Sequence, residues 1–306
     1  MRASGDKISV VIPVFNRRHE VLRAIASVLR QERQADEILV VDDGSTDGSA
    51  AAVAGLNEPR IKLLRHDTNR GAAAARNTGI AAARGAWVAF LDSDDEWDAS
   101  KLRLQLAALS DASSGAPAGV TGFVLEDSRI GVRQSVHPAA RDATFDAIAS
   151  GCFLGLGSTL LARRAVFDEV GLLDPELPRL EDWEWLMRYL PAHPLGVLPE
   201  ALAIVHKGSD PSVGRVTAAL ARIRTKHRRL WYQHSWLAGR KFDSTLLVEE
   251  AAASYYARDL TRAALLSLRA LSAYPFRGPG FVGLLLRRAL RSRESRARDA
   301  QSRSQI

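Results

Sequence analysis

Three carboxylates follow a short apolar strand in the first third of the chain. The strand is expected from Trp87 to Leu91, and the carboxylates belong to Asp92, Asp94 and Asp95. A buried strand has no structural need for clustered negative charge at its end, whereas Mg²⁺ takes oxygen ligands and is held by one or two carboxylates together with substrate phosphates. We therefore predict that Asp92 and Asp94 hold a divalent metal, Mg²⁺ or Mn²⁺, with a diphosphate. The alternative is that these residues only precede a helix, which the spacing predicts from Leu102 to Leu109.

Three earlier apolar runs indicate which elements position these carboxylates. Strands are predicted for Ile8 to Val14, Glu37 to Val41 and Ile61 to Leu64, with segments of helical spacing between them. This alternation predicts an α/β fold with a mixed, mainly parallel sheet flanked by helices. Ligands of such sheets bind beyond the carboxyl ends of the strands. The polar residues that follow the runs there are Asn16, Asp42, Asp43, Asn69, Arg70, Asp92 and Asp94.

The rest of the chain is predicted to complete this sheet and then to become helical. Further strands are expected at Gly119 to Leu125, Gly157 to Ala162 and Ala201 to Val205, and a short helix at Arg163 to Val170. From Leu246 to Leu271, apolar residues and alanines recur at helical spacing, which predicts a helical hairpin packed onto the catalytic domain. We therefore predict a catalytic domain at residues 1–235 and a helical extension with a basic tail at residues 236–306.

Four signatures, in this order along the chain, resemble those of family 2 glycosyltransferases. They are Ile12 to Asn16, Val40 to Asp47, Asn69 to Gly71 with Ala75 to Asn77, and Phe90 to Asp95. The resemblance extends over roughly residues 7–210 and is specific as an ordered set. It implies the GT-A fold, a nucleotide-sugar donor and a divalent metal.

The resemblance also implies roles for individual residues near the donor. Pro13 and Phe15, with Asp42 or Asp43, would hold the base and ribose; Arg70 or Arg76 would lie near the nucleotide; and Asp92 and Asp94 would serve the ribose, metal and diphosphate. Asp43 and the residues after it alternatively form only a turn and a helix cap. Arg76 is alternatively a surface charge on an alanine-rich helix, although arginine suits bidentate phosphate contact.

A second acidic pair, Glu181 and Asp182, precedes Trp183 and an amphipathic stretch, 88 residues after Asp94 (182 − 94 = 88). This pair is also similar to the family pattern. A hydroxyl that displaces a nucleoside diphosphate from a sugar must lose its proton, and a carboxylate can accept that proton as general base. We predict that Asp182 is this base, that the anomeric centre is inverted, and that Glu181 and Trp183 shape the acceptor side. The alternative is that the pair merely begins a helix, whose dipole favours acidic side chains.

His206 follows the predicted strand at Ala201 to Val205. In some relatives a histidine at a comparable place joins the metal shell, and imidazole suits ions such as Mn²⁺. His206 is therefore predicted as a third metal ligand, with a purely structural histidine as the alternative.

Cysteine content and hydropathy indicate the compartment. Cys152 is the only cysteine of the 306 residues, so no internal disulfide forms and a reducing compartment is expected. Met1 to Lys7 lacks the apolar region of a signal peptide, and no run approaches the ~20 apolar residues of a membrane helix. We predict a cytoplasmic protein.

The end of the chain has a different character. Phe281 to Leu286 is apolar and is followed by Arg287, Arg288 and further arginines. This pattern predicts a helix on an anionic membrane surface. The alternatives are a solvated basic tail or weak nucleic-acid contact through charge alone.

The predicted function is an inverting, metal-dependent glycosyltransferase that moves a hexosyl or related group to a hydroxyl of a glycan or lipid-linked acceptor in cell-envelope polysaccharide or glycolipid synthesis. One alternative is a nucleotidyltransferase, which would carry a Gly-rich, basic phosphate loop where this chain has Val14 to Arg18. Another is a basic nucleic-acid-binding protein, which the net charge of +7 permits. Much of that excess lies in the tail and no recognition motif is present, so nucleic acid is not an expected partner.

Overall fold

The computed structural model describes residues 7–111, 115–128, 131–207 and 212–277. The chain forms two compact units, the first of Met1–Ser209 with Gly214–Ile223, and the second of Asp210–Val213 with Arg224–Ile306. The predicted domain boundary at residue 235 stays a prediction. The predicted membrane-surface tail, Phe281 onward, lies outside the described residues.

One half of the central sheet is parallel, as the sequence predicts. Its strands stand in the order β3-β2-β1-β4, and β1 pairs in parallel with both β2 and β4. The pairing of Val10 with Ile38 and with Ala89 sets the register across the three inner strands. As a result, the loops after β1, β2 and β4 leave the same edge of the sheet. The bounds are β1 Ile8–Val14, β2 Glu37–Asp42, β3 Ile61–Arg65 and β4 Trp87–Phe90.

The other half of the sheet is mixed. β8 runs antiparallel to β4 and to β6, β9 is parallel to β6, and β5 and β7 add antiparallel edges to β9 and β6. The pairing of β5 with β9 brings the end of the predicted metal motif beside His206, because Glu96 stands opposite Ile204. The bounds are β5 Glu96–Trp97, β6 Ala118–Asp127, β7 Val132–Val136, β8 Leu161–Arg163 and β9 Leu195–His206.

The predicted strand at residues 157–162 is wrong in its first part. Leu156–Thr159 forms the short helix α6, and the strand begins only at Leu161. The cause is local: Gly155 has a φ of 62°, which starts a helical turn, and the Thr159 hydroxyl donates to the Leu154 carbonyl. The strands β5 and β7 were not predicted, because β5 has two residues and the pattern of β7 is mostly polar.

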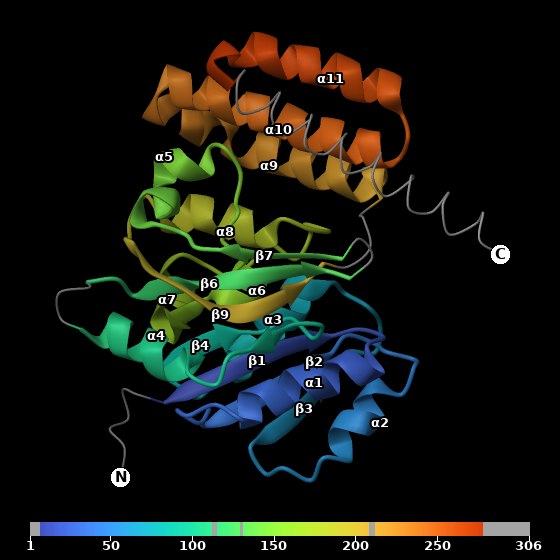
Figure 1. Ribbon diagram of the computed structural model, residues 1–306, viewed down its shortest axis with the longest axis vertical. Helices are drawn as coiled ribbons and strands as arrows, with labels where there is room; N and C mark the ends of the chain where they lie inside the picture. Colours follow the sequence, from blue (N-terminus) through green and yellow to red (C-terminus); the bar gives the residue numbers. More distant parts are fainter. Residues whose placement is uncertain (1–6, 112–114, 129–130, 208–211, 278–306) are drawn as a thin grey trace. The chain divides into compact units, whose positions relative to one another are not determined.

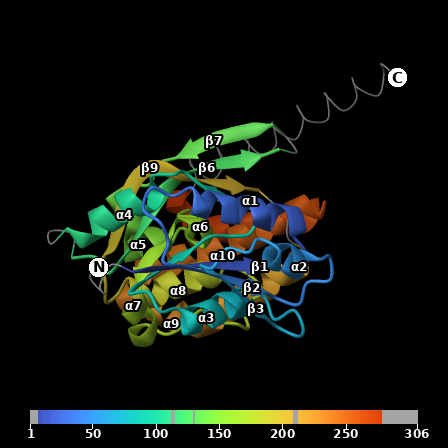
Figure 2. The same cartoon turned by 90° about the horizontal axis from the view of Figure 1, so that it is seen from below.

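Helices cover both faces of the parallel strands, and Figure 2 shows α1 on one side and α3 on the other. Alternate residues of β1 serve the two faces, as the pleat requires. Val10 belongs to the core cluster with Val21 and Ile25 of α1, whereas Val11 faces α3 so closely that a Cβ on Gly79 would lie 2.3 Å from its Cγ1. The helices of the first unit are α1 Arg18–Leu29, α2 Ser49–Ala54, α3 Ala72–Ala82, α4 Lys101–Ser110, α5 Phe145–Ile148, α6 Leu156–Thr159, α7 Arg164–Glu169 and α8 Glu181–Tyr189, with the 3-10 turn η2 Ala140–Ala143.

The second unit contains the predicted pair of helices. α9 Val213–His234 continues into this unit from the first, and is followed by α10 Trp236–Tyr256, α11 Leu260–Ala273 and the 3-10 turn η3 Pro275–Arg277. Side chains cap both later helices, since Ser235 accepts from the Leu237 and Ala238 N–H groups and Asp259 accepts from that of Arg262. α10 and α11 run side by side (Figure 1). None of the described helices combines the length and the hydropathy that crossing a membrane requires.

Candidate active site

The loops after β1 and β2 are joined to each other at the edge of the sheet. The Asn16 N–H donates to Ser45 Oγ at 2.9 Å, and Asn16 Oδ1 accepts from the Thr46 N–H at 2.8 Å. Asn16 has a φ of 50°, in the left-handed region that asparagine tolerates better than most residues. Pro13 is buried within β1, whereas the Phe15 ring is exposed beside this junction, where a flat ligand has access to it.

The carboxylates of Asp42 and Asp43 are buried and hold neighbouring loops in place. Asp42 accepts from the Ser45 N–H and pairs with Arg65 Nε, both at 3.1 Å. Asp43 accepts from the N–H groups of Arg70 and Gly71, at 2.9 and 2.7 Å, and contacts the buried His66 ring. These contacts match the turn-forming alternative, and the nucleotide-binding role of both residues stays a prediction. Arg70 joins this network through its backbone, and its side chain is exposed.

Arg76 of α3 is the centre of the site, because it joins the two acidic motifs. Its Nη2 lies 2.5 Å from Asp92 Oδ1, and its Nη1 lies 2.5 Å from Glu181 Oε1. The residue is only 5% exposed, so the alternative of a surface charge is wrong. Burial by itself lowers the pKa of Arg76, but the carboxylates of Asp92 and Glu181 outweigh burial and hold that pKa above its ordinary value. Residues 92 and 181, distant in sequence, are therefore brought together by one guanidinium.

The predicted metal motif after β4 is held in place by an ion pair and by hydrogen bonds to buried Asp95. Asp94 forms an ion pair with Arg17, and burial followed by the nearby Asp92 charge raises the pKa of Asp94. Asp95 is buried, accepts from Ser158 Oγ and accepts from the His206 N–H at 2.8 Å. Burial also raises the pKa of Asp95 well above its ordinary value.

One glycine and one serine of α6, Gly157 and Ser158, contact this motif. Ser158 Oγ accepts from the Asp92 N–H at 3.0 Å, so it bridges Asp92 and Asp95. A Cβ on Gly157 would lie 2.3 Å from Asp92 Oδ2, which leaves no room for a larger residue beside that carboxylate. The α6 turn, which the sequence pattern did not predict, therefore packs against Asp92 and fixes the position of its carboxylate.

His206 lies close enough to this motif to belong to the same site. Its N–H is bound by Asp95, its Nε2 lies 3.6 Å from Glu96 Oε1, and that buried Nε2 has no hydrogen-bond partner among the described residues. An unpartnered imidazole nitrogen beside carboxylate oxygens is a donor set that suits Mg²⁺ or Mn²⁺. Within the described ranges, however, no three His, Cys, Asp or Glu side chains already stand close enough together to hold a metal. The residues fit a metal ion in their chemistry, and their role as ligands stays a prediction.

Asp182 lies in the first turn of α8, next to Glu181. Leu180, which precedes the helix, has a φ of 64°, a strained conformation for leucine that starts α8 at this position. Burial, and then the Glu181 charge, raises the pKa of Asp182 to about 6. A small cavity of about 10 Å³, enough for about one water molecule, is lined by Asp182, Arg76 and Gly157 among others. A carboxylate with this pKa, beside a small space, has the properties expected of a general base.

Trp183 lies in the core of the first unit. It is buried, and its Nε1 donates to the Ile148 carbonyl at 2.9 Å. Its ring is therefore packed in the core and is not exposed for a sugar ring to stack on. The Glu181 carboxylate forms an ion pair with Arg76, and the acceptor-binding role of both residues stays a prediction.

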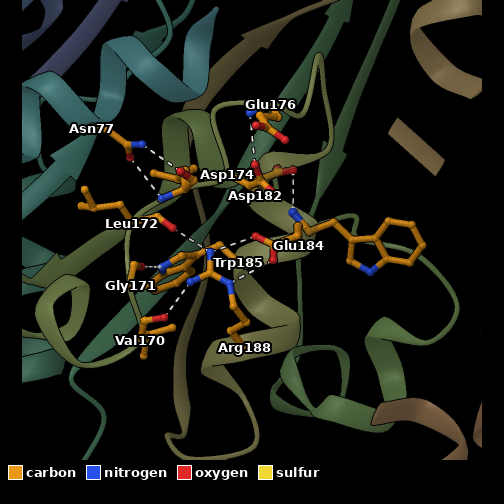
Figure 3. Close-up of polar contacts among 12 residues, drawn as sticks. Asn77, Val170, Gly171, Leu172, Asp174, Glu176, Asp182, Glu184, Trp185 and Arg188 are labelled. Atoms are coloured by element: carbon orange, nitrogen blue, oxygen red, sulfur yellow. Dashed lines mark hydrogen bonds and ion pairs between the residues drawn. The ribbon is translucent and has the colours of Figure 1, made fainter. Parts of the chain in front are cut away.

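The segment before α8 is tied to both α8 and α3, as Figure 3 shows. Arg188 donates to the carbonyls of Val170 and Leu172 at 2.6 and 2.7 Å. Asn77 accepts from the Leu173 N–H and donates to its carbonyl, at 3.0 and 2.8 Å. Asn77 follows Arg76 in α3, so successive residues of one helix tie this segment and Glu181 to the parallel half of the sheet.

Comparison with known proteins identifies the family. The sequence profile described as "Glycosyl transferase family 2" matches residues 9–171, which contain the four signatures from Ile12 to Asp95. The chain belongs to glycosyl transferase family 2. Among its relatives, it is 33% identical over 156 residues to the Escherichia coli UDP-Glc:alpha-D-GlcNAc-diphosphoundecaprenol beta-1,3-glucosyltransferase WfgD, a match that covers 51% of this chain and 60% of WfgD. It is 46% identical over 96 residues to the succinoglycan biosynthesis protein ExoO of Rhizobium meliloti, covering 31% and 28% of the two chains. The matches thus span 60% or less of these relatives.

Solved structures of similar fold extend beyond the profile match. S. aureus TarS 1-349 in complex with UDP-GlcNAc superimposes with a TM-score of 0.58 at 19% identity, covering 85% of this chain and 90% of that one. The mannosyltransferase PcManGT from Pyrobaculum calidifontis, in complex with GDP-Man and Mn²⁺, has a TM-score of 0.57 at 19% identity and covers 93% and 79%. At these identities the likeness shows the fold, and the GT-A fold predicted for this family 2 member is confirmed.

Four residues of this family 2 site were not predicted as site residues: Arg17, Asn77, Asp95 and Ser158. Asp95 belongs to the quoted motif and Asn77 to the third signature, so for these two a signal was present in the sequence. Arg17 directly follows the first signature. Ser158 had no such signal, because the α6 turn was read as a strand.

Proposed function

We propose that this chain is an inverting, metal-dependent glycosyltransferase that moves a sugar from a nucleotide-sugar donor to a hydroxyl of a glycan or lipid-linked acceptor. The observation that carries this proposal is the bridge formed by Arg76 between Asp92 and Glu181. Asp92 belongs to the donor motif, and Glu181 is the neighbour of the candidate base Asp182. A site that joins these two motifs through one buried cation is organised for transfer between two substrates.

On the donor side, Asp92, Asp94 and His206 would hold Mg²⁺ or Mn²⁺. A metal bound there would stabilise the negative charge of the departing diphosphate. The unpartnered Nε2 of His206 and the exposed Phe15 ring support a donor site at this edge of the sheet. The complexes of TarS with UDP-GlcNAc and of PcManGT with GDP-Man and Mn²⁺ support it by analogy.

On the acceptor side, Asp182 would act as general base. As the acceptor hydroxyl oxygen bonds to the anomeric carbon, its proton passes to Asp182 and the bond from that carbon to the diphosphate oxygen breaks. A single displacement of this kind inverts the anomeric centre. With its pKa raised to about 6, Asp182 is largely ionised at neutral pH and yet basic enough to accept a proton.

The names of the relatives support a substrate class. WfgD is named for transfer to a diphosphoundecaprenol-linked sugar, and ExoO for succinoglycan biosynthesis. We therefore propose an acceptor in cell-envelope polysaccharide or glycolipid synthesis, and action from the cytoplasmic side of the membrane.

The test is a panel of UDP- and GDP-sugars with Mg²⁺, Mn²⁺ or EDTA, assayed for donor hydrolysis and for transfer to polyprenyl-diphosphate-linked sugars. We expect one donor to be hydrolysed in a metal-dependent manner, and the product anomer determined by NMR to be inverted. Full activity in EDTA would contradict the metal role, and a retained anomeric configuration would contradict the single displacement. Transfer of a nucleotidyl group instead of a sugar would overturn the proposal as a whole.

A further inference from the structure

One side of α11 carries leucines that are exposed in the part of the chain that the structure describes. Leu266 and Ala270 pack with Leu247 and Ala251 of α10, which accounts for the buried side of the helix. On the other side, Leu260, Leu265 and Leu268 are between 57% and 67% exposed. We call these three residues the leucine face. Exposed leucines are ordinary when single, but a group on one helix side, in a helix that already has its core contacts, indicates a binding surface.

Aromatic side chains extend the apolar surface at the C-terminal end of α11. Phe276, in the turn η3, is 77% exposed. Trp236 is 68% exposed and lies at the same end, because Arg240 stacks on its ring and also donates to the carbonyls of Ser272 and Ala273. Tryptophan and phenylalanine next to leucines are typical of helices that lie in the headgroup region of a bilayer.

The charge around the leucine face is positive. α11 contains Arg262 and Arg269 and no acidic residue, although Arg262 pairs with Glu250 of α10 at 2.7 Å. Exposed Arg258 and the capping residue Asp259 precede the helix. Residues 224–306 contain 17 Lys and Arg against 6 Asp and Glu, a net charge of +11, of which residues 224–277 carry +6 (10 − 4). Since the whole chain has a net charge of +7, residues 1–223 have a net charge of −4 (7 − 11). The positive charge of the protein is thus concentrated in the part of the chain that contains the exposed leucines.

We propose that the leucine face of α11, with Trp236 and Phe276, docks the protein onto an anionic lipid surface. Leucines that enter the headgroup region, flanked by arginines that pair with lipid phosphates, are the arrangement that an interfacial helix requires. A second copy of the chain is disfavoured as the occupant, because it would bring two strongly basic surfaces together. Nucleic acid would use the arginines but would leave the leucines exposed to water. The residues of this surface are distinct from the predicted membrane-surface tail, Phe281 onward, and from the candidate catalytic residues.

The test compares full-length variants for cosedimentation with phosphatidylcholine vesicles that contain or lack phosphatidylglycerol. The wild type should bind only the anionic vesicles. Leu265→Ser combined with Leu268→Ser should weaken this binding by about tenfold to a hundredfold, since two leucines lose most of their apolar transfer energy. Arg269→Glu should weaken it by about fivefold or more, with no change on neutral vesicles.

The matched control is Leu56→Ser combined with Leu172→Ser, two exposed leucines of the first unit, which should leave vesicle binding unchanged. Thermal unfolding of each variant checks that the fold is intact. The proposal would be overturned if the Leu265/Leu268 variant bound the vesicles as well as the wild type does. That includes the case in which only deletion of residues 278–306 abolishes vesicle binding. Conversion of a wild-type dimer to a monomer by the same two substitutions would do so as well, because a second copy would then be the occupant.

Discussion

Replacing Arg76 by methionine tests the central feature of the site. The change keeps the length of the apolar stem but removes a buried cation that two carboxylates share. Breaking a buried ion pair by removing one partner costs about 3–5 kcal/mol. Asp92 has a side chain that is 36% exposed and can regain water, whereas Glu181 is 12% exposed, so we expect a loss near the lower end, about 3 kcal/mol. Arg76→Lys, which keeps the charge but reaches one carboxylate at a time, should cost less.

The same substitution should change the pH dependence of transfer. The Arg76 charge lowers the pKa of Asp182 against the larger effects of burial and of Glu181. Without Arg76, the pKa of Asp182 rises above about 6, so the acidic limb of the kcat profile should move to higher pH. Arg76→Lys should keep the limb close to its wild-type position.

The assays are chemical denaturation and a pH–rate profile with a working acceptor. The control is Arg103→Met, which breaks the exposed pair with Glu32 and should cost less than about 1 kcal/mol without moving the profile. An acidic limb that stays in place in Arg76→Met, or a stability loss as small as that of the control, would refute the reasoning.

Four further outcomes are expected. Asp182→Asn should lower transfer by about 10²–10⁴-fold while donor binding measured by calorimetry changes little; near-wild-type transfer would remove Asp182 from the mechanism. The pKa of Asp182 is about 6 in the folded state against an ordinary value of 3.8, so the folded state binds the proton more tightly and the free energy of unfolding falls as pH rises from about 4 to 6. In denaturant titrations, Asp182→Asn should therefore be more stable than wild type above pH 6 and equal to it below about pH 4. Asp94→Asn should abolish the Mn²⁺ dependence of donor binding with little change in ligand-free melting temperature, and unaltered metal dependence would count against Asp94 as a ligand. Gly157→Ala should displace the Asp92 carboxylate and lower kcat/KM by up to about 10²-fold, and an unchanged value would show that Asp92 tolerates the shift.

The sequence alone determined the parallel half of the sheet. Apolar runs rich in β-branched residues, such as Ile8–Val14, are typical of buried central strands, and the helical spacing between them favours a parallel sheet covered by helices. The motifs at the strand ends followed from this, because the carboxyl ends of parallel strands meet at one edge. The α6 turn at Leu156–Thr159 could not be predicted in the same way, since it depends on the φ of Gly155 and on one hydroxyl contact.

Tertiary structure alone decided which charged groups meet. Arg76 has the same local sequence whether it faces solvent or the core, and only the packing of α3 against β1 buries it between Asp92 and Glu181. Trp183 is likewise predicted to shape the acceptor side, and only the fold shows that it is buried with its Nε1 donating to the Ile148 carbonyl. Hydrophobic periodicity is a property of neighbours along the chain, and it predicts elements. Ion pairs between residues about a hundred positions apart depend on the distances that folding sets, and a sequence pattern does not contain those distances.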